Sequence, residues 1–122
     1  MQYDKGSMLK KYVQSKLEKY VKKYVARHPD VKIIVVTGTV GKTSTKRAIA
    51  DVLSSRFRIR MHEGEVAVDS ELAVPLAILG ITPPQDVGSI REWRSVFKTA
   101  RRHIASATDT DVIIVELQID HP

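Results

Sequence analysis

The feature that most constrains this chain is an apolar segment that stops at a glycine-rich turn and is followed at once by a helical pattern. Residues 31–37 are VKIIVVT, the turn continues as GTVGKTS, and residues 42–56 have helical spacing. The apolar face of this helix is expected to comprise Ala48, Ile49, Val52 and Leu53. A strand with no polar alternation after Lys32 is typical of a parallel sheet that is covered on both faces. We therefore expect a buried parallel strand, a tight turn and a helix in direct succession.

The residues of the turn have the chemistry of a phosphate site. A helix N-terminus presents unpaired backbone N–H groups and the positive end of the helix dipole. Gly38 and Gly41 allow close approach of the backbone to a ligand, and the Lys42 side chain can reach the β- and γ-phosphates. Thr43 places a hydroxyl where Mg²⁺ binds, and Ser44 adds a second hydroxyl. The predicted nucleotide-binding set is Gly38, Thr39, Val40, Gly41, Lys42, Thr43 and Ser44.

The strict P-loop pattern G-x-x-x-x-G-K-[ST] is not met, because Val36 stands where the first glycine belongs. One interpretation of the turn is a glycine that ends a strand, followed by an unrelated Lys-Thr pair. However, a buried strand before the turn and an amphipathic helix after it are the context that a phosphate loop requires. We favour nucleotide phosphate binding on that ground.

The rest of the chain predicts further helices and strands. Helical spacing recurs over residues 8–27, 71–79 and 90–104. Strand patterns occur over residues 58–63 and 111–117, and residues 80–89 are expected to form a loop. Trp93 is expected in the core with Ile90 and Phe97. This order of elements predicts an α/β fold: a three-layer, P-loop NTPase-like domain with a mostly parallel sheet, preceded by an amphipathic N-terminal helix.

The first helix is basic, and its apolar residues recur at steps of three and four. These residues are Leu9, Tyr12, Val13, Leu17, Tyr20, Val21, Tyr24 and Val25. Either this stripe packs on the domain, or the helix contacts a membrane surface or nucleic acid. We favour packing, because a stripe made mainly of Tyr and Val lacks the Trp, Phe and Leu bulk expected of a strong interfacial helix. The predicted division is residues 1–7 as a candidate tag or disordered segment, 8–28 as the basic helix and 30–122 as a partial ATP-binding domain.

Composition narrows the partners and the chemistry. The net charge of +6 favours an anionic partner, for which we expect a nucleotide rather than nucleic acid. The chain has no cysteine, which excludes disulfides and thiol catalysis, and no apolar run of membrane length, so we expect a cytoplasmic location. The histidines share no metal-ligand spacing and are expected to be at the surface or incidental: His28, His62, His103 and His121.

Three segments match motifs that occur together in one enzyme superfamily. The turn TGTVGKTST matches T-G-[ST]-x-G-K-T-[ST]-[ST]. Residues 67–81, AVDSELAVPLAILGI, match N-x-N-N-E-x-G-V-P-L-x-L-L at Glu71, Val74, Pro75, Leu76 and Leu79. The final segment, DVIIVELQIDHP, matches V-x-E-x-G-x-x-x-P-G-D-I at Glu116 and Pro122. Together they resemble the Mur ligase superfamily of peptidoglycan precursor synthesis and folylpolyglutamate synthase, and within it the branch that adds D-alanyl-D-alanine to the UDP-muramoyl tripeptide.

The resemblance implies roles for particular residues. It implies that Gly41, Lys42 and Thr43 bind the ATP phosphates, that Thr43 ligands one Mg²⁺ and that Glu116 ligands a second; Lys42 and Glu116 are the candidate catalytic residues. The position of Glu116 agrees, because a carboxylate at the end of a buried parallel strand lies where a nucleotide metal needs an oxygen ligand. The alternative is a strand-end charge in solvent. Glu71 either lies near the site, as in the family, or stabilises the start of its helix.

In the full enzyme, the resemblance implies that ATP converts a substrate carboxylate into an acyl phosphate. An amine then attacks it to form an amide, releasing phosphate. The implied substrates are a UDP-muramoyl-peptide and an amino acid or dipeptide.

The chain also departs from the family pattern. Asp69 and Ser70 replace the paired asparagines, Ala73 replaces a glycine, and Gln118 replaces the glycine after the strand glutamate. The resemblance covers only the N-terminal part of the central ATPase domain, so we expect that this polypeptide does not ligate alone, and that it self-associates or needs a partner with the missing domains. The alternative is a non-catalytic nucleotide-binding or interaction module. A P-loop kinase or GTPase is a weaker third hypothesis; the GTPase motif N-K-x-D is missing.

Overall fold

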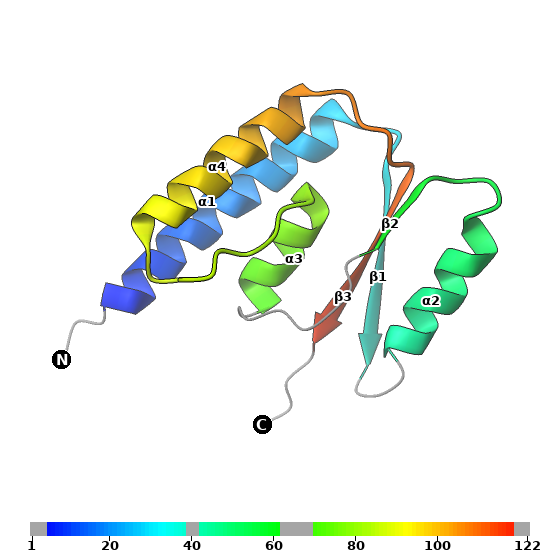
Figure 1. The fold of residues 1–122 in the computed structure, drawn as a ribbon, viewed down its shortest axis with the longest axis horizontal. Coiled ribbons are helices and arrows are strands. Elements are labelled where there is room, and N and C mark those ends of the chain that lie inside the picture. The colour runs from blue at the N-terminus through cyan, green and yellow to red at the C-terminus, as the bar shows by residue number, and fades with distance from the viewer. Residues whose placement is uncertain (1–4, 39–41, 62–69, 119–122) are drawn as a thin grey trace.

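The computed structural model describes residues 5–38, 42–61 and 70–118. Within these ranges the chain forms four helices and three strands in the predicted order, so the prediction of an α/β fold is confirmed (Figure 1). The elements are α1 (Lys5–Arg27), β1 (Lys32–Gly38), α2 (Lys42–Leu53), β2 (Ile59–Met61), α3 (Ser70–Leu79), α4 (Ile90–Ala105) and β3 (Val112–Gln118). The first helix therefore begins three residues before its predicted start.

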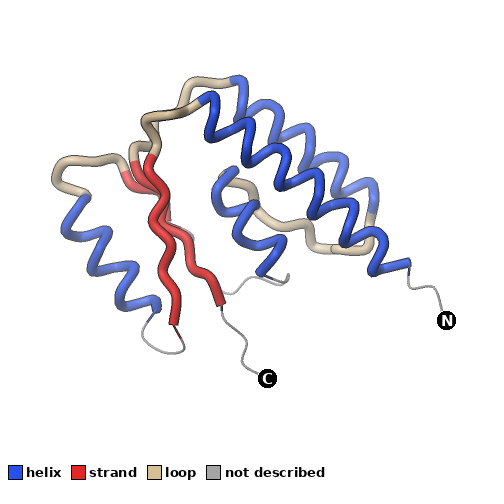
Figure 2. Tube along the Cα trace, turned by 180° about the vertical axis from the view of Figure 1, so that it is seen from behind, coloured by secondary structure: helices blue, strands red, loops and turns tan. Residues whose placement is uncertain are grey.

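The three strands form a parallel sheet in the order β1-β3-β2, with β3 in the centre. The connection from β1 to β2 runs through α2 on one face of the sheet, and the connection from β2 to β3 runs through α3 and α4 on the other (Figures 1 and 2). Helices therefore cover both faces. This arrangement is compatible with a Rossmann-like or P-loop-like fold.

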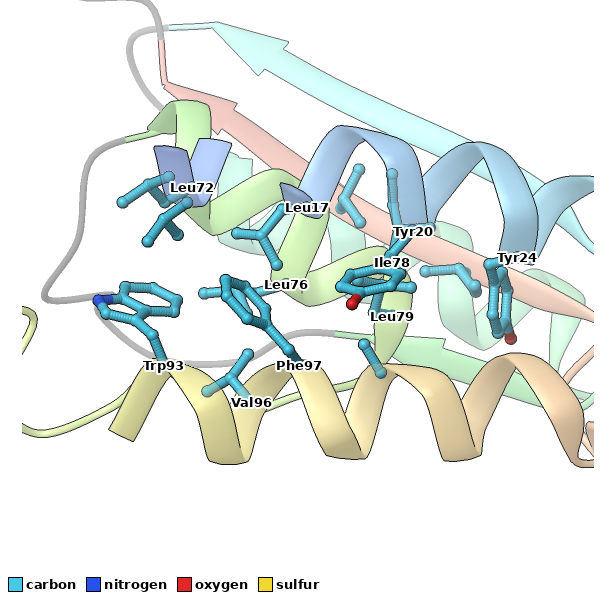
Figure 3. Packing of buried hydrophobic residues seen from close by; sticks show 14 residues of the cluster. Leu17, Tyr20, Tyr24, Leu72, Leu76, Ile78, Leu79, Trp93, Val96 and Phe97 are labelled. Atoms are coloured by element: carbon cyan, nitrogen blue, oxygen red, sulfur yellow. The ribbon is translucent and has the colours of Figure 1, made fainter. Parts of the chain in front are cut away.

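Two apolar clusters hold the layers together, because successive residues of β3 point to opposite faces of the sheet. Ile113 and Val115 join the larger cluster with α1, α3 and α4 (Figure 3). Val112 and Ile114 pack on the other face with Val36 and the helix α2. The central strand is thus enclosed on both sides, as a continuous apolar strand should be.

The apolar stripe of α1 packs into the larger cluster, as favoured from the sequence. Its buried members are Val13, Leu17, Tyr20 and Tyr24, whereas Tyr12 and Val25 of the same stripe are 55% and 44% exposed. Helix α1 contacts both α3 and α4, and it runs beside α4 in the same direction (Figures 1 and 2). None of the described helices is long and apolar enough to cross a bilayer.

The sequence prediction of a strand buried on both faces is wrong for β1. Val35 is 49% exposed and Ile33 and Ile34 are only partly buried, whereas Val36 is buried. The reason is position: β1 pairs with β3 alone and forms an edge of the described sheet. The sequence pattern was that of a central strand, but it carries no information about which neighbours the strand acquires.

Two predicted helix faces also need correction. On α2, Val52 is 74% exposed, and the residues that pack on the sheet are Ile49, Ala50 and Leu53. On α4, Trp93 and Phe97 are buried as expected, but Ile90 is 56% exposed. Ile90 is the first residue of its helix, so it lies beyond the end of the packed face.

Helix α3 ends in a Schellman motif at Gly80. This glycine has a φ of 74°, and the N–H of Ile81 donates to the carbonyl of Leu76 over 2.9 Å. An added Cβ would lie 2.5 Å from Nη1 of Arg60, whose guanidinium donates to the carbonyl of Ile78. The backbone angle therefore favours glycine here, and a side chain at this position would also make the Arg60 guanidinium shift.

Gly80→Ala is expected to lower the free energy of unfolding by about 1–2 kcal/mol, because a left-handed conformation is costly for a residue with a Cβ. Urea unfolding followed by circular dichroism measures the change. Gly88→Ala is the control, because its Cβ would meet only the Asp86 side chain at 3.4 Å. Equal losses in both variants would show that the Schellman conformation contributes nothing specific.

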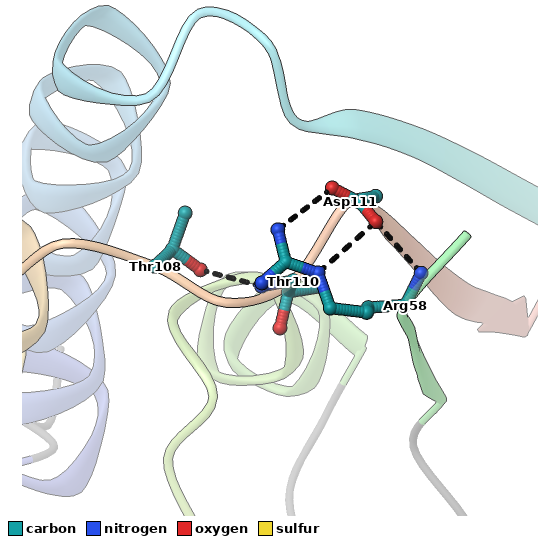
Figure 4. Close-up of polar contacts among 4 residues, drawn as sticks. All are labelled: Arg58, Thr108, Thr110 and Asp111. Atoms are coloured by element: carbon teal, nitrogen blue, oxygen red, sulfur yellow. Dashed lines mark hydrogen bonds and ion pairs between the residues drawn. The ribbon is translucent and has the colours of Figure 1, made fainter. Parts of the chain in front are cut away.

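The amino ends of the three strands are tied together through Asp111. The backbone N–H of Arg58 donates to its Oδ2 over 2.7 Å, and the guanidinium of Arg58 donates to both carboxylate oxygens (Figure 4). The N–H of Lys32 donates to the carbonyl of Asp111 over 3.0 Å. The side-chain hydrogen bonds from Arg58, followed by its backbone N–H, hold the pKa of Asp111 below its ordinary value.

A lowered pKa means that the native state favours ionised Asp111. Its contribution to stability is therefore present above the unfolded-state pKa of about 3.9 and is lost as the pH falls through the lower native value. We expect Asp111→Asn to be less stable than wild type at pH 7 and the difference to shrink towards pH 2. Urea unfolding over this range is the measurement, with Asp51→Asn as the exposed-carboxylate control. A difference that does not change with pH would contradict this assignment.

Candidate functional site

The predicted phosphate turn lies where β1 ends and α2 begins. Gly38 is the last residue of β1, and Lys42, Thr43 and Ser44 are the first three residues of α2. Residues 39–41, which include the predicted Thr39, Val40 and Gly41, lie outside the described residues. With 12 residues, α2 is long enough to have a developed dipole whose positive end is at this turn. The strand before the turn and the helix after it, both expected from the sequence, are therefore present.

Glu116 lies at the same end of the sheet, where the strands have their carboxyl ends. It is in the carboxyl-terminal half of β3, opposite Val36 of β1, and Gln118 lies opposite Gly38. Because β1 and β3 are adjacent and parallel, the end of β1 and the carboxylate of Glu116 belong to neighbouring strands. The structure thus brings Glu116 and the start of α2 to one end of the sheet, on the face that α2 covers.

A buried lysine of α2 contacts this carboxylate. The Nζ of Lys46 lies 2.9 Å from Oε2 of Glu116. The Lys46 side chain is 4% exposed and that of Glu116 is 21% exposed. Burial of a charged ammonium is costly unless a counter-charge accompanies it, so this ion pair joins α2 to β3 at the candidate site.

Sequence reasoning did not identify Lys46, although the sequence contained a signal. Lys46 precedes Ile49, Ala50 and Leu53 by three, four and seven residues, the spacing of one helix face. Those three residues pack on the sheet. A lysine on the buried face of a helix requires a buried hydrogen-bond acceptor. The Glu116 carboxylate, which follows the apolar run of residues 112–115, could be that acceptor.

Glu116 is the described carboxylate at this end of the sheet, and a carboxylate is a ligand that Mg²⁺ accepts. Among the described residues there is no group of three or more His, Cys, Asp or Glu side chains that could hold a metal ion. Mg²⁺ does not require one, because it usually takes one or two carboxylates and completes its shell with phosphate oxygens and water. Glu116 already holds a cation in this structure, the Lys46 ammonium, so its carboxylate is placed to bind positive charge.

Other residues with chemical potential lie elsewhere. Glu71 is in the first turn of α3 and pairs with Lys10 of α1 over 3.4 Å, which favours the helix-stabilising interpretation. Two histidines are partly buried. The Nδ1 of His103 lies 2.7 Å from the carbonyl oxygen of Leu79, and the Nε2 of His28 lies 3.3 Å from the carbonyl oxygen of His103. They link helix ends rather than form a site, and the other two histidines lie outside the described residues.

Two cavities also lie away from the predicted site. One, of about 450 Å³, lies between the amino-terminal parts of α1 and α4 and is mainly apolar in its lining residues. The other, of about 610 Å³, is at the amino ends of the strands and is lined by Arg27, His28, Arg58 and Asp111 among others. Neither includes a described residue of the predicted nucleotide set.

Comparison with known proteins gives a similarity that covers part of the chain. Over 56 residues the chain is 41% identical to a UDP-N-acetylmuramoyl-tripeptide–D-alanyl-D-alanine ligase of Synechocystis sp.. The matched segment is 46% of this chain and only 12% of the length of that enzyme. No family profile matches the chain, and no solved structure matches it. The similarity points to the Mur ligases at most.

Proposed function

We propose that this chain is the ATP- and magnesium-binding part of a Mur-type amide ligase. The partial similarity to a ligase of peptidoglycan synthesis supports the family. The observation that carries the site is the position of Glu116, on the strand next to β1 and on the face covered by the helix that follows the glycine-rich turn. A carboxylate there is well placed to share a metal ion with phosphates bound at the turn.

Each residue has a distinct part in the proposed site. The N–H groups at the start of α2 bind phosphate oxygens, with the helix dipole adding to the attraction. Lys42 neutralises charge on the β- and γ-phosphates, and Thr43 and Glu116 hold the metal. Bound magnesium lowers the cost of the charge that gathers on the transferred phosphoryl group. In the complete ligase that group passes to a substrate carboxylate, and an amine then displaces phosphate to leave an amide.

Lys46 is proposed to position Glu116 before the nucleotide arrives. Its ammonium fixes the carboxylate at the end of the sheet and neutralises it without a metal. Because Glu116 already pairs with Lys46, magnesium would have to compete with this ammonium for the carboxylate. Metal affinity without nucleotide is therefore expected to be low, and ATP and magnesium are expected to bind together.

Calorimetric titration with ATP, with and without magnesium, tests this proposal. Magnesium should strengthen ATP binding to the wild type, and Glu116→Gln should remove that strengthening while keeping the metal-independent part. Asp109→Asn, an exposed carboxylate at the start of the β3 region, is the matched control. Equal magnesium dependence in wild type and Glu116→Gln would remove Glu116 from the metal site.

A further inference from the structure

Positive charge is concentrated in two of the seven described elements. Helices α1 and α4 contain 13 of the 20 lysines and arginines of the chain but only two of its 14 carboxylates, Glu18 and Glu92. The rest of the chain is therefore acidic on balance, although the whole carries +6. The basic residues are Lys5, Lys10, Lys11, Lys16, Lys19, Lys22, Lys23, Arg27, Arg91, Arg94, Lys98, Arg101 and Arg102.

These two helices form an outer layer of the molecule, which we call the basic layer. They lie side by side along their length, with α3 between them and the sheet (Figures 1 and 2). Their apolar faces are buried in the larger cluster, so the charged residues are on the solvent side. The exposed cations are Lys11, Lys19, Lys22, Lys23, Arg27, Arg91, Arg94, Lys98, Arg101 and Arg102.

Exposed apolar side chains lie at the amino-terminal end of the basic layer. Met8 is 50% exposed, Tyr12 is 55% exposed and Ile90 is 56% exposed. They line the cavity of about 450 Å³ whose other walls include Trp93 and Phe97. Exposed apolar side chains gathered in one place among cations are a feature of interaction surfaces.

We propose that the basic layer docks on an anionic lipid bilayer. Cations spread over the whole length of two adjacent helices match an extended negative surface, whereas an acidic peptide in the cavity would reach only those near one end. Met8, Tyr12 and Ile90 match the boundary between headgroups and acyl chains, for which a nucleic-acid backbone offers no counterpart. Most of the α1 stripe that the sequence put forward for membrane contact is buried, so the contact is made by the exposed residues of the helix, which include Tyr12 of that stripe. This proposal does not depend on the nucleotide site.

Co-sedimentation with vesicles tests the proposal. The chain is expected to bind phosphatidylcholine vesicles that contain a quarter phosphatidylglycerol, to bind pure phosphatidylcholine weakly, and to dissociate at about 0.5 M salt because of screening. The triple variant Lys19→Gln, Lys23→Gln, Lys98→Gln should bind about 100-fold more weakly, since each cation near the surface contributes roughly fivefold. Its control is Lys32→Gln, Arg47→Gln, Arg56→Gln, which removes three exposed cations outside the basic layer.

The apolar contribution needs its own pair of variants. Ile90→Ser should weaken binding to the anionic vesicles by about fivefold, and Val52→Ser, at a 74% exposed valine on α2, should have no effect. Circular dichroism of each variant confirms that the fold is kept. The proposal is overturned if both triple variants lose the same affinity, if neutral vesicles bind equally well, or if a DNA duplex competes fully with the vesicles and Ile90→Ser has no effect.

Discussion

Glu116→Ala is expected to lower the free energy of unfolding by about 3–5 kcal/mol, the cost typical of breaking a buried ion pair by removing one partner. The variant takes the counter-charge away from an ammonium whose side chain is only 4% exposed. Lys46→Met should cost less, because the carboxylate that remains is 21% exposed and can reach water. Urea unfolding at pH 7 without nucleotide measures both losses.

The double variant Lys46→Met, Glu116→Leu serves as the control for this stability prediction. Replacing both charges by apolar groups of similar size removes the desolvation cost along with the attraction, so most of the lost stability should return. A cost below about 1 kcal/mol for Glu116→Ala would show that the pair is not formed in solution. Such a result would also leave Glu116 without the positioning that the proposed metal site requires.

Lys42→Ala is expected to weaken ATP binding by roughly 30-fold or more, equivalent to about 2 kcal/mol, because it removes a charge-assisted contact to the phosphates. The loss should appear with and without magnesium, which distinguishes it from the effect of Glu116→Gln. Titration calorimetry or competition with a fluorescent ATP analogue measures it.

The control for Lys42 is Lys32→Ala. Lys32 is an exposed cation at the opposite end of β1, so the two variants carry the same change in net charge. If both variants lose the same affinity, ATP is held by general attraction to a basic protein. The glycine-rich turn would then have no specific role.

The sequence predicted the order and type of the elements because local patterns determine them. Helical spacing and apolar runs located all seven described elements, with ends that differ by one to three residues in most cases. Four residues of the α1 stripe lie in the core as predicted, whereas Tyr12 and Val25 of the same stripe are exposed. The family resemblance drew on the same local features, the turn and the strand glutamate.

The features that the sequence did not reveal depend on which elements pack next to one another in the fold. The apolar run of β1 resembles that of β3, yet Val35 is half exposed and Val115 is fully buried, because only β3 lies between two strands. The ion pair of Lys46 with Glu116 joins residues 70 positions apart, and only the register of α2 on the sheet brings them together. The side-by-side packing of α1 and α4 likewise follows from the fold, and with it the concentration of charge in one layer.

One departure from the family pattern now has a location. Gln118 replaces a glycine of the motif and pairs with Gly38, the residue that opens the turn. Ala73 is half-buried in α3, on the face of the sheet opposite α2 and therefore away from the proposed site. Of these two positions, Gln118 is the one that lies beside the strand leading into the predicted turn.

The most direct test of the nucleotide site is an amide NMR titration of the isotope-labelled chain with ATP and magnesium. The chain carries a basic layer as well as a glycine-rich turn, so binding alone does not identify the place. We predict large shifts for the amides of residues 38–44 and for Glu116, and little change in α1 and α4. Shifts confined to α1 and α4, with the turn unaffected, would contradict the assignment of this turn as the site that holds the phosphates.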